Sequence, residues 1–482
     1  MTTESAALKL DKNDPDVIVR AYKFALNPTP SQEQKLRQHT GGARFVYNYL
    51  ISRWHDDIHT RIEEKERGVS EDELTPFAFK LSTYDMINYW NRTKCECAPW
   101  WSEVSKEIGN DAAHRVHDSM KNWLDSKNRK RKGGRVGFPR FHKRGYHESC
   151  TFSTGAIRVN PDRRSVTLPR IGTIKTYENT RGLQRKIAKG TARIIRATIS
   201  RGFNYWHVSF TVYERKRIPE THRNPGSVVG VDMGVGDHVI VAANPHGDEV
   251  MRRGLPTTIA DHDKIIRHLQ RKLSRKRGPD KRTKTAPSNR WTRANNQIRK
   301  HYNTMSNVCR DFAAKAAHDL AKNYETVVIE DLNVRAMMAR GGAYKRGLNR
   351  AIAQASFADL RRRIAYKTQW NGGTTIVADR WFPSSKTCSR CGEVKSKLSL
   401  SERKYMCHRC GIVVDRDLNA ATNLAKLAEP KSGISSIDRT GSSPGMGRGG
   451  AGKTSSLSGG LAPAGEASMV RKDLSGCKAG TR

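Results

Sequence analysis

The sequence predicts a multidomain fold in which a small β-barrel with a helical insert precedes an α/β domain. Three observations support this fold class. The chain has 482 residues, more than the roughly 250–300 residues at which a single hydrophobic core stops growing. Short β-branched runs fill residues 149–212, which is typical of small antiparallel sheets. Strand-like and helix-like runs then alternate after residue 226, which indicates an α/β domain.

The N-terminal segment predicts one strand followed by helices. Residues 17–27 mix β-branched, aromatic and polar residues, as strands do. The next four residues, Pro-Thr-Pro-Ser, end this strand and offer Ser31 as a helix cap. Apolar residues then recur at three- and four-residue steps, so we expect a largely helical stretch to about Leu124.

Four short runs between Ser149 and Val212 predict further strands. They are SVTLP, GTIKTY, ARIIRATISR and YWHVSFTVY, separated by Gly, Pro or Asn. Together with the N-terminal strand they predict a β-barrel formed by residues 1–30 and 146–225, with a helical lobe of residues 31–145 inserted between them. Arg223–Gly226 has the composition of a linker.

The second half of the chain predicts the α/β domain. Residues 228–251 are typical of a β-hairpin, and helical spacing in Asp261–Lys300 breaks around Gly278. Further expected elements are helix 303–323, strand 326–332, helix 356–370 and strand 374–382. We assign residues 226–380 and 412–430 to this domain and residues 381–411 to a small inserted module. Residues 431–482 are rich in Gly and Ser without periodicity, which predicts a disordered tail.

Positive charge dominates the composition. The chain has 88 Lys and Arg against 47 Asp and Glu, a formal net charge of +41. Such an excess opposes compaction unless a polyanion screens it, so we expect a nucleic-acid partner. A solvated basic surface and an anionic membrane are the alternatives, but the charge runs along the whole chain. No long apolar run or secretory signal is visible, so we expect no membrane association and a cytoplasmic, nucleoid-associated location.

A basic loop at Lys127–Arg144 carries two aromatic rings, Phe138 and Phe141. Arg and Lys suit phosphates, and flat rings suit unpaired bases. The alternative is a solvated loop that two rings anchor to the protein. The candidate nucleic-acid contacts in this loop and in the later helical segment are Lys130, Arg131, Arg135, Phe138, Arg140, Phe141, Lys143, Arg144, Arg271, Lys272, Arg275 and Lys276.

Two cysteine pairs predict a structural zinc site. Fifteen residues separate the pairs, which is a spacing typical of zinc modules; the four cysteines are Cys388, Cys391, Cys407 and Cys410. Gly392 and Gly411 follow the pairs and allow the turn that aims both thiolates at one ion. Two redox pairs or coincidence are the alternatives. His408 is expected to be a solvent-facing spacer, and four sulfurs would leave no open position for water.

Three acidic residues are candidate ligands of catalytic magnesium. Asp232 interrupts an apolar strand-like run, Glu330 ends another, and Asp417 precedes a helical stretch. Taken singly they fit a turn residue, a surface charge at a strand end and a helix N-cap. Together they fit phosphodiester hydrolysis by two Mg²⁺ ions, which needs carboxylates from distant chain positions about two metals roughly 3.5–4 Å apart.

Three neighbouring acids could substitute for these candidates. Asp237, Asp331 and Asp415 lie close to them in sequence. In a strand, Asp331 would face away from Glu330. Asp415 is only two residues from Asp417, so it is the more serious rival.

These motifs resemble the TnpB family, transposon-encoded nucleases related to compact type V CRISPR effectors. The resemblance rests on GVDMG, VIEDL and DRDLNAATN, with CSRCG and CHRCG between the last two. Weaker matches are YKFALNPTPSQEQKL, GARFVYNYL, FPRFHKR and LPRIGTIKT, so the similarity covers residues 18–428. It selects the aspartate directly before x-Asn-Ala-Ala, which is Asp417 rather than Asp415.

Membership of this family would imply a specific architecture and activity. The barrel would be a wedge domain, the helical insert a recognition lobe, and the α/β domain an RNase H-like (RuvC) nuclease with a zinc-ribbon insert. The implied activity is RNA-guided DNA endonuclease cleavage with two catalytic Mg²⁺ ions, one structural Zn²⁺, a guide RNA and a target DNA. A nuclease-inactive regulator and a strand-transfer transposase are the alternatives.

Overall fold

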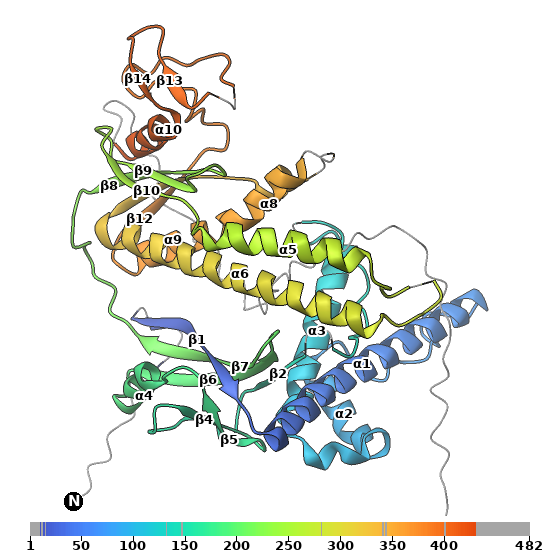
Figure 1. Cartoon of the computed structure of the whole chain (residues 1–482). Helices are drawn as coiled ribbons and strands as arrows, with labels where there is room; N and C mark the ends of the chain where they lie inside the picture. Colours follow the sequence, from blue (N-terminus) through green and yellow to red (C-terminus); the bar gives the residue numbers. More distant parts are fainter. Residues whose placement is uncertain are drawn as a thin grey trace, which may run out of the picture.

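The computed structural model describes most of the chain as a mixed α/β protein with two large sheets (Figure 1). The described residues are 10, 13–14, 16–131, 133–145, 148–280, 282–339, 342, 345–399 and 402–429. The predicted tail, residues 431–482, lies outside these ranges. Among these residues, every helix is too short or too polar to span a lipid bilayer.

The N-terminal part begins with one strand and then forms helices. Its elements are β1 (Val17–Asn27), α1 (Pro30–Glu66), α2 (Thr83–Cys97), the 3-10 helix η1 (Pro99–Glu103) and α3 (Glu107–Lys127). The predicted strand is confirmed with the same bounds. The predicted cap at Ser31 is wrong: Thr29 caps α1 in a reciprocal pair with Gln32, and Pro30 occupies the first helical position, where its missing N–H costs nothing.

The first sheet is antiparallel and has seven strands in the order β2-β6-β7-β1-β5-β4-β3. Its remaining strands are β2 (Ser149–Phe152), β3 (Arg158–Val159), β4 (Ser165–Leu168), β5 (Gly172–Thr176), β6 (Ala192–Arg201) and β7 (Trp206–Arg215). The N-terminal strand β1 lies in the middle of this sheet, between β7 and β5. Helix α4 (Arg181–Ala188), which the sequence pattern did not predict, connects β5 to β6.

One apolar core joins the helices to this first sheet. Leu36, Val46 and Leu50 of α1 are fully buried in the same cluster as Phe152 of β2 and Phe210 of β7. Because the helices and the sheet share a core, the helical segment between β1 and β2 is packed onto the sheet that it interrupts.

The second sheet has five strands in the order β10-β9-β8-β11-β12. The strands are β8 (Val228–Met233), β9 (Ile240–Ala243), β10 (Glu249–Arg253), β11 (Thr326–Glu330) and β12 (Thr374–Ala378). The first three pair antiparallel, and β11 runs parallel to both β8 and β12. The predicted hairpin is therefore part of a three-stranded meander, because β10 adds a third strand to it.

Helices cover both faces of the second sheet (Figure 1). On one face, apolar residues of α6 (Asn289–Asn323), α8 (Lys345–Ala355) and α9 (Phe357–Gln369) pack on β8 and β11. Helix α10 (Arg416–Ala425) covers the other face through Ala421 and Leu424. Two further elements are short: α7 (Val334–Met338) and the 3-10 helix η2 (Lys426–Ala428).

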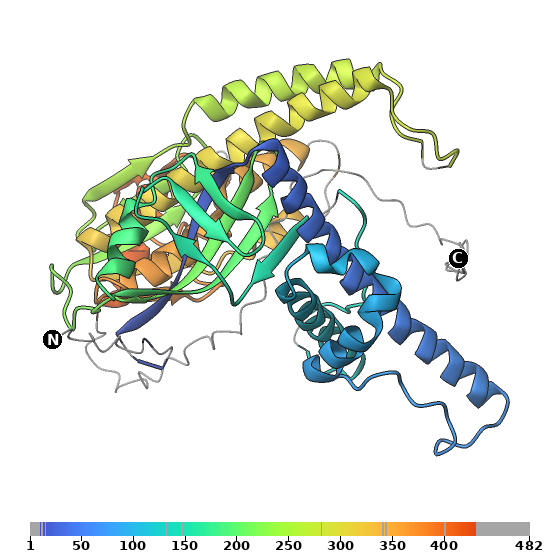
Figure 2. The same cartoon turned by 90° about the horizontal axis from the view of Figure 1, so that it is seen from below.

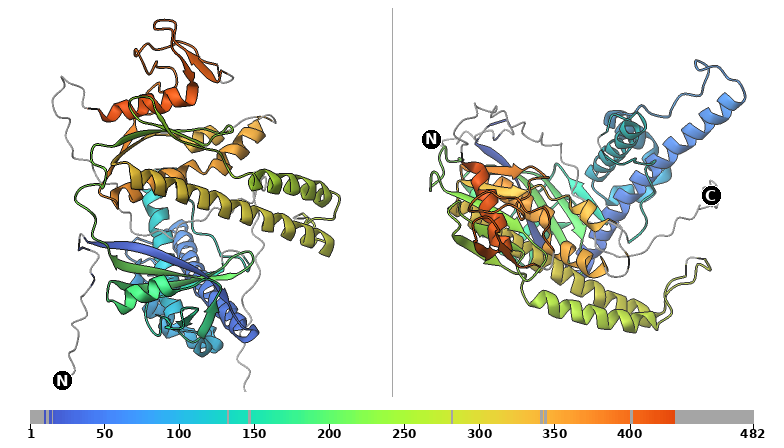
Figure 3. Two further views of the ribbon diagram at one scale, coloured as in Figure 1. Left: turned by 60° about the vertical axis from the view of Figure 1, so that its left-hand side comes forward. Right: turned by 90° about the horizontal axis from the view of Figure 1, so that it is seen from above.

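Two segments project from the second sheet. Helix α5 (Thr258–Ser274) packs along α6 through Ile259, Ile266 and Ile298, and this pair extends away from the sheet (Figures 2 and 3). The break around Gly278 is confirmed, since α5 ends before it and α6 starts after it. The antiparallel pair β13 (Lys404–Met406) and β14 (Val413–Asp415) precedes α10 in sequence. It forms a small module at one end of the molecule, on the side of α10 away from the second sheet (Figure 1).

Candidate functional site

Asp232 and Glu330 lie on neighbouring parallel strands at the same end of the second sheet. Val231 of β8 is in register with Ile329 of β11, so Asp232 and Glu330 are the next residues along these two strands. Val231 and Ile329 point into the core on the α6 side. Because side chains alternate along a strand, Asp232 and Glu330 project from the opposite face, which α10 covers.

Helix α10 brings the third acid to this face through a close approach at Gly230. A Cβ atom on Gly230 would lie 2.1 Å from the backbone oxygen of Ala421, so only glycine allows the helix backbone to rest on β8. Asp417 is one helical turn before Ala421 and thus on the same side of the helix. Gly230 is two residues before Asp232 on the same face of its strand, so Asp417 and Asp232 become neighbours.

The environment of these acids opposes the accumulation of negative charge. Burial raises the pKa of Asp232 well above its usual value, and the charges of Glu330 and Asp417 raise it further. Burial also raises the pKa of Glu330. A buried carboxyl group whose ionisation two neighbouring acids oppose belongs to a donor set that a hard divalent cation would stabilise.

Ser384 holds the second acid in place. Its hydroxyl donates a 2.6 Å hydrogen bond to Oε1 of Glu330, and the residue is 4% exposed. The side chain of Asn423 in α10 donates to the backbone oxygen of Ser384 at 2.8 Å and to that of Thr387 at 2.7 Å. The segment after β12 is therefore tied to both Glu330 and α10. Sequence reasoning missed Ser384, because no local pattern distinguishes it from Ser385.

Two of the rival acids are engaged elsewhere or exposed. Asp331 accepts hydrogen bonds from Arg361 of α9 at 2.6 Å and from Arg380 at 2.5 Å. These contacts lower its pKa and hold it toward α9, away from Glu330 as the strand alternation predicted. Asp237 is exposed in the turn between β8 and β9.

The third rival, Asp415, is the N-cap of α10. Its side chain accepts hydrogen bonds from the backbone N–H of Asp417 at 3.1 Å and of Leu418 at 3.0 Å, and Arg252 contacts it at 3.2 Å. Although burial alone would raise the pKa of Asp415, the bonds from Leu418 and Arg252 lower it. The alternative that Asp417 is the N-cap is therefore wrong, and Asp417 lies in the first turn.

Four cysteine sulfurs form the closest cluster of candidate metal ligands. Within the described ranges, only Cys388, Cys391, Cys407 and Cys410 bring three or more such atoms within 4.8 Å of one another. Sulfur distances are 3.6 Å for Cys388 and Cys410, and 3.5 Å for Cys391 and Cys407. The three acids are neighbours but do not approach one another this closely.

The backbone around the cysteines has the geometry of two metal-binding turns. Gly392 N–H donates to Cys388 O at 3.0 Å, and Gly411 N–H donates to Cys407 O at 3.0 Å. Both glycines have positive φ, 76° and 72°, which confirms why glycine follows each pair. The close contacts cross between the pairs, at distances far beyond the roughly 2.05 Å of a disulfide. This argues against two redox pairs, and His408 is exposed as expected.

Comparisons with known proteins decide the family. A protein of Mycobacterium tuberculosis H37Rv with the provisional name RNA-guided DNA endonuclease Rv2885c is 35% identical over 429 residues, covering 87% of this chain and 88% of its own. TnpB-like protein L79 of Acanthamoeba polyphaga mimivirus is 32% identical over 148 residues, covering 30% of this chain and 28% of its own. The chain belongs to the TnpB family.

Family models, a further relative and a solved structure also resemble parts or most of this chain. Three family models match the chain. Residues 18–63 match the helix-turn-helix domain of the OrfB_IS605 type, and residues 210–340 match OrfB_IS605, which is described as a probable transposase. Residues 357–424 match the Cas12f1-like TNB domain. InsQ of Escherichia coli K12, provisionally named an RNA-guided DNA endonuclease, is 26% identical over 84% of this chain and 91% of its own. A Cas12f1–sgRNA–target DNA complex aligns with a TM-score of 0.47 at 13% identity, covering 85% of this chain and 99% of that one.

In this TnpB-family chain the predicted basic loop, Lys127–Arg144, is largely exposed, and one of its two aromatic rings packs against the protein. Phe138 packs edge-on against Trp123, with ring centroids 5.2 Å apart, and borders the main core, which fits the anchoring alternative. The ring of Phe141 is 54% exposed. The predicted cationic contacts of the loop are all exposed: Lys130, Arg131, Arg135, Arg140, Lys143 and Arg144.

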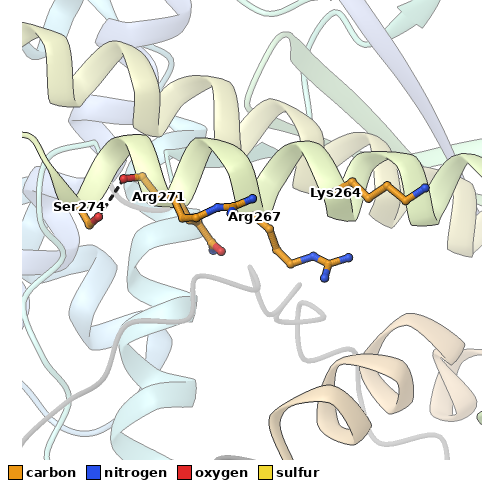
Figure 4. Close-up of a pocket in the computed structure, with 5 residues that line it drawn as sticks. Lys264, Arg267, Arg271 and Ser274 are labelled. Atoms are coloured by element: carbon orange, nitrogen blue, oxygen red, sulfur yellow. Dashed lines mark hydrogen bonds between the residues drawn. The ribbon is translucent and has the colours of Figure 1, made fainter.

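Helix α5 carries a second basic surface on this TnpB-family chain. Of the predicted residues, Arg271, Lys272 and Arg275 are exposed and Lys276 is half-buried. Lys264, Arg267 and Arg271 line a hollow on α5 together with Gln270 and Ser274 (Figure 4). Sequence reasoning missed Lys264 and Arg267, although their spacing to Arg271 places all three on one side of a helix.

Proposed function

We propose that this chain is an RNA-guided DNA endonuclease that hydrolyses phosphodiester bonds at a centre formed by Asp232, Glu330 and Asp417. The observation that carries the proposal is their convergence: β8, β11 and α10 contribute one acid each to the same face at one end of the second sheet. Relatives that carry the provisional name RNA-guided DNA endonuclease support the same activity.

The donor set suits two Mg²⁺ ions. Carboxylate oxygens are the ligands that this ion prefers, and it keeps water and substrate phosphate as further ligands. When bound, the two ions supply activation of a water molecule and stabilisation of the leaving 3′ oxygen. Asp232, Glu330 and Asp417 would hold them, and Ser384 orients Glu330 through its hydrogen bond. The expected products have 5′-phosphate and 3′-hydroxyl ends.

We further infer that the four cysteines hold one structural zinc ion. A tetrahedron with Zn–S bonds of about 2.3 Å has sulfurs about 3.8 Å apart. The closest sulfur pairs here, at 3.5 and 3.6 Å, are compatible with this size. In this proposal residues 381–411 are the zinc ribbon, inserted into a RuvC-like domain of residues 226–380 and 412–430. The strand order β10-β9-β8-β11-β12, antiparallel and then parallel, supports an RNase H-like arrangement.

The N-terminal half would bind the nucleic acids. We assign the seven-stranded sheet, within residues 1–30 and 146–225, to a wedge-like barrel and residues 31–145 to a recognition lobe. A guide RNA is a large polyanion that would offset the net charge of +41. The exposed cations of the basic loop and of α5 would contact its phosphates, which requires charge rather than base-specific groups.

The test compares cleavage by the wild type with that by Asp232→Ala, both purified from cells that carry the native locus so that any bound RNA is retained. We expect Mg²⁺-dependent cutting of DNA complementary to that RNA, no cutting by the variant, and equal RNA content in both. Asp237→Ala serves as the control, because that exposed acid lies outside the centre.

The alternatives predict different products. A nuclease-inactive regulator would retain salt-sensitive nucleic-acid binding without any Mg²⁺-dependent product. A transposase, in line with the description of the OrfB_IS605 family, would join a donor DNA end to a target rather than leave two free ends. Cutting by Asp232→Ala at the wild-type rate would overturn the assignment of the centre.

A further inference from the structure

Trp381 presents its indole ring to solvent beside the acid centre. The residue is 85% exposed, more than any other large hydrophobic residue in the described part of the chain. A tryptophan normally buries most of its large apolar surface, and Trp and Tyr are enriched where proteins bind partners. The exposure of this tryptophan therefore indicates that its ring is a binding surface.

The loop that carries Trp381 is fixed on both sides of the ring. Arg380 donates a 2.5 Å hydrogen bond to Asp331, and Phe382 packs against the apolar cluster beneath α10. The backbone N–H of Trp381 itself donates to the carboxylate of Asp379 at 2.8 Å. The exposure of the ring thus reflects a defined turn that directs it outward.

Two contacts to Glu330 bracket this turn. Ala378, three residues before Trp381, is the strand partner of Glu330, and Ser384, three residues after it, bonds to the Glu330 carboxylate. Three residues span at most about 10 Å, so Trp381 lies close to the second acid. Stacked nucleotides in one DNA strand are about 3.4 Å apart, so the ring is within reach of bases about three nucleotides from the reacting phosphate.

We propose that Trp381 is a stacking site for an unpaired base of the DNA strand that enters the acid centre. This inference rests on the proposed function, because the acids define where that strand passes. A flat indole stacks on any of the four bases. Such a contact would hold the strand without reading it, which suits an enzyme whose sequence selection comes from pairing with a guide RNA.

The binding test uses the full-length chain with its co-purified RNA, in the Asp232→Ala background so that DNA stays intact. Single-stranded DNA carries the fluorescent base 2-aminopurine at successive positions around the expected cut. We expect quenching at one to three adjacent positions, retained in Trp381→Phe and lost in Trp381→Ala. Leu348→Ala shortens another exposed large apolar side chain, 44% exposed on α8 on the opposite face of the second sheet, and should leave the quenching unchanged.

A cleavage test links the ring to the same base. In the cutting-competent protein, Trp381→Ala should cut about fivefold or more slowly than the wild type, the loss expected for one base stack. With an abasic site at the contacted position, the two proteins should cut at equal rates. Unchanged quenching and cutting in Trp381→Ala would overturn the proposal and leave the ring as a surface for a protein partner. If even the wild type does not cut, the proposed function fails, while the quenching still decides the stacking.

Discussion

Asp415 and Asp417 are two residues apart, yet they serve different purposes in helix α10. The carboxylate of Asp415 accepts the first free N–H groups of the helix, whereas Asp417 lies on the side that faces β8. Both are partly exposed, at 40% and 20% of their side chains, so exposure alone does not separate them. Their hydrogen-bond partners separate them, because the carboxylate of Asp415 accepts from backbone N–H groups, whereas that of Asp417 accepts from the side chain of its neighbour Arg416 at 3.2 Å.

Substitution of Asp415 should therefore lower stability, whereas substitution of Asp417 should abolish cleavage. Asp415→Ala removes the cap and should lower the free energy of unfolding by about 1 kcal/mol. Asp417→Ala should leave stability nearly unchanged and abolish DNA cleavage. Thermal unfolding and a cleavage assay on both variants check this. Asp415→Asn keeps a capping side chain and should restore most of the stability. Loss of cleavage in Asp415→Ala at wild-type stability would assign the third ligand to Asp415 instead.

Ser384 should matter through Glu330 alone. Ser384→Ala removes a hydrogen bond to a charged group, worth about 1.5–3 kcal/mol, so we expect cleavage to slow by about tenfold or more. Because the freed carboxylate would hold metal less well, the Mg²⁺ concentration for half-maximal cleavage should rise. Ser384→Thr keeps the hydroxyl and should recover activity. The matched control is Ser385→Ala. Equal Mg²⁺ dependence in Ser384→Ala and wild type would exclude this positioning role.

At the scale of elements, the approach of α10 to β8 depends on one glycine. Gly230→Ala would place a Cβ 2.1 Å from Ala421 O and 2.3 Å from Ala425 N, both backbone atoms that cannot rotate away. We expect a loss of about 1–3 kcal/mol in urea unfolding and a loss of cleavage, since Asp417 moves with the helix. Gly41→Ala in α1 is the control, because nothing lies within 4 Å of its added Cβ. Wild-type cleavage by Gly230→Ala would contradict this account.

The cysteine module predicts a metal dependence of its own. Purified protein should contain one zinc ion per chain by elemental analysis, and Cys407→Ser should lose it. Removal of zinc should speed hydrogen exchange at the N–H groups of Gly392 and Gly411, whose bonds close the two metal-binding turns. Cys95→Ser changes an exposed cysteine outside the cluster and should retain the metal. A wild-type protein free of zinc, with slow exchange at both glycines, would refute the zinc assignment.

Local patterns predicted most elements and failed where tertiary contacts decide. Strand β1 was predictable because its β-branched residues end at a proline, yet its helix cap shifted from Ser31 to Thr29, where the reciprocal bonds with Gln32 form. Helix α4 escaped notice because it has only eight residues and buries only Leu183. Strand β10 was not predicted as a separate strand and fell within the predicted hairpin, because its residues do not alternate between buried and exposed.

For the whole molecule, the site candidates were visible in sequence but their neighbours were not. An aspartate in an apolar strand and four cysteines at a fixed spacing are local signals. The hydrogen bond between Ser384 and Glu330 joins residues that are 54 positions apart in the sequence. The position of Asp417 beside Asp232 depends on the contact between Gly230 and α10. No short window of sequence contains both partners of either contact. The charge of +41 predicted a polyanionic partner, but the hollow that Lys264, Arg267 and Arg271 line on α5 is known only from the fold.

The central claim is that β8, β11 and α10 bring three carboxylates together to hold a pair of metal ions. The most direct measurement is a crystal structure of the complex with guide RNA, DNA and Mn²⁺, in which anomalous scattering locates the ions. We expect two peaks about 3.5–4 Å apart, bound by Asp232, Glu330 and Asp417. Ions bound without these side chains, or three carboxylates that share no ion in the DNA-bound state, would contradict the account.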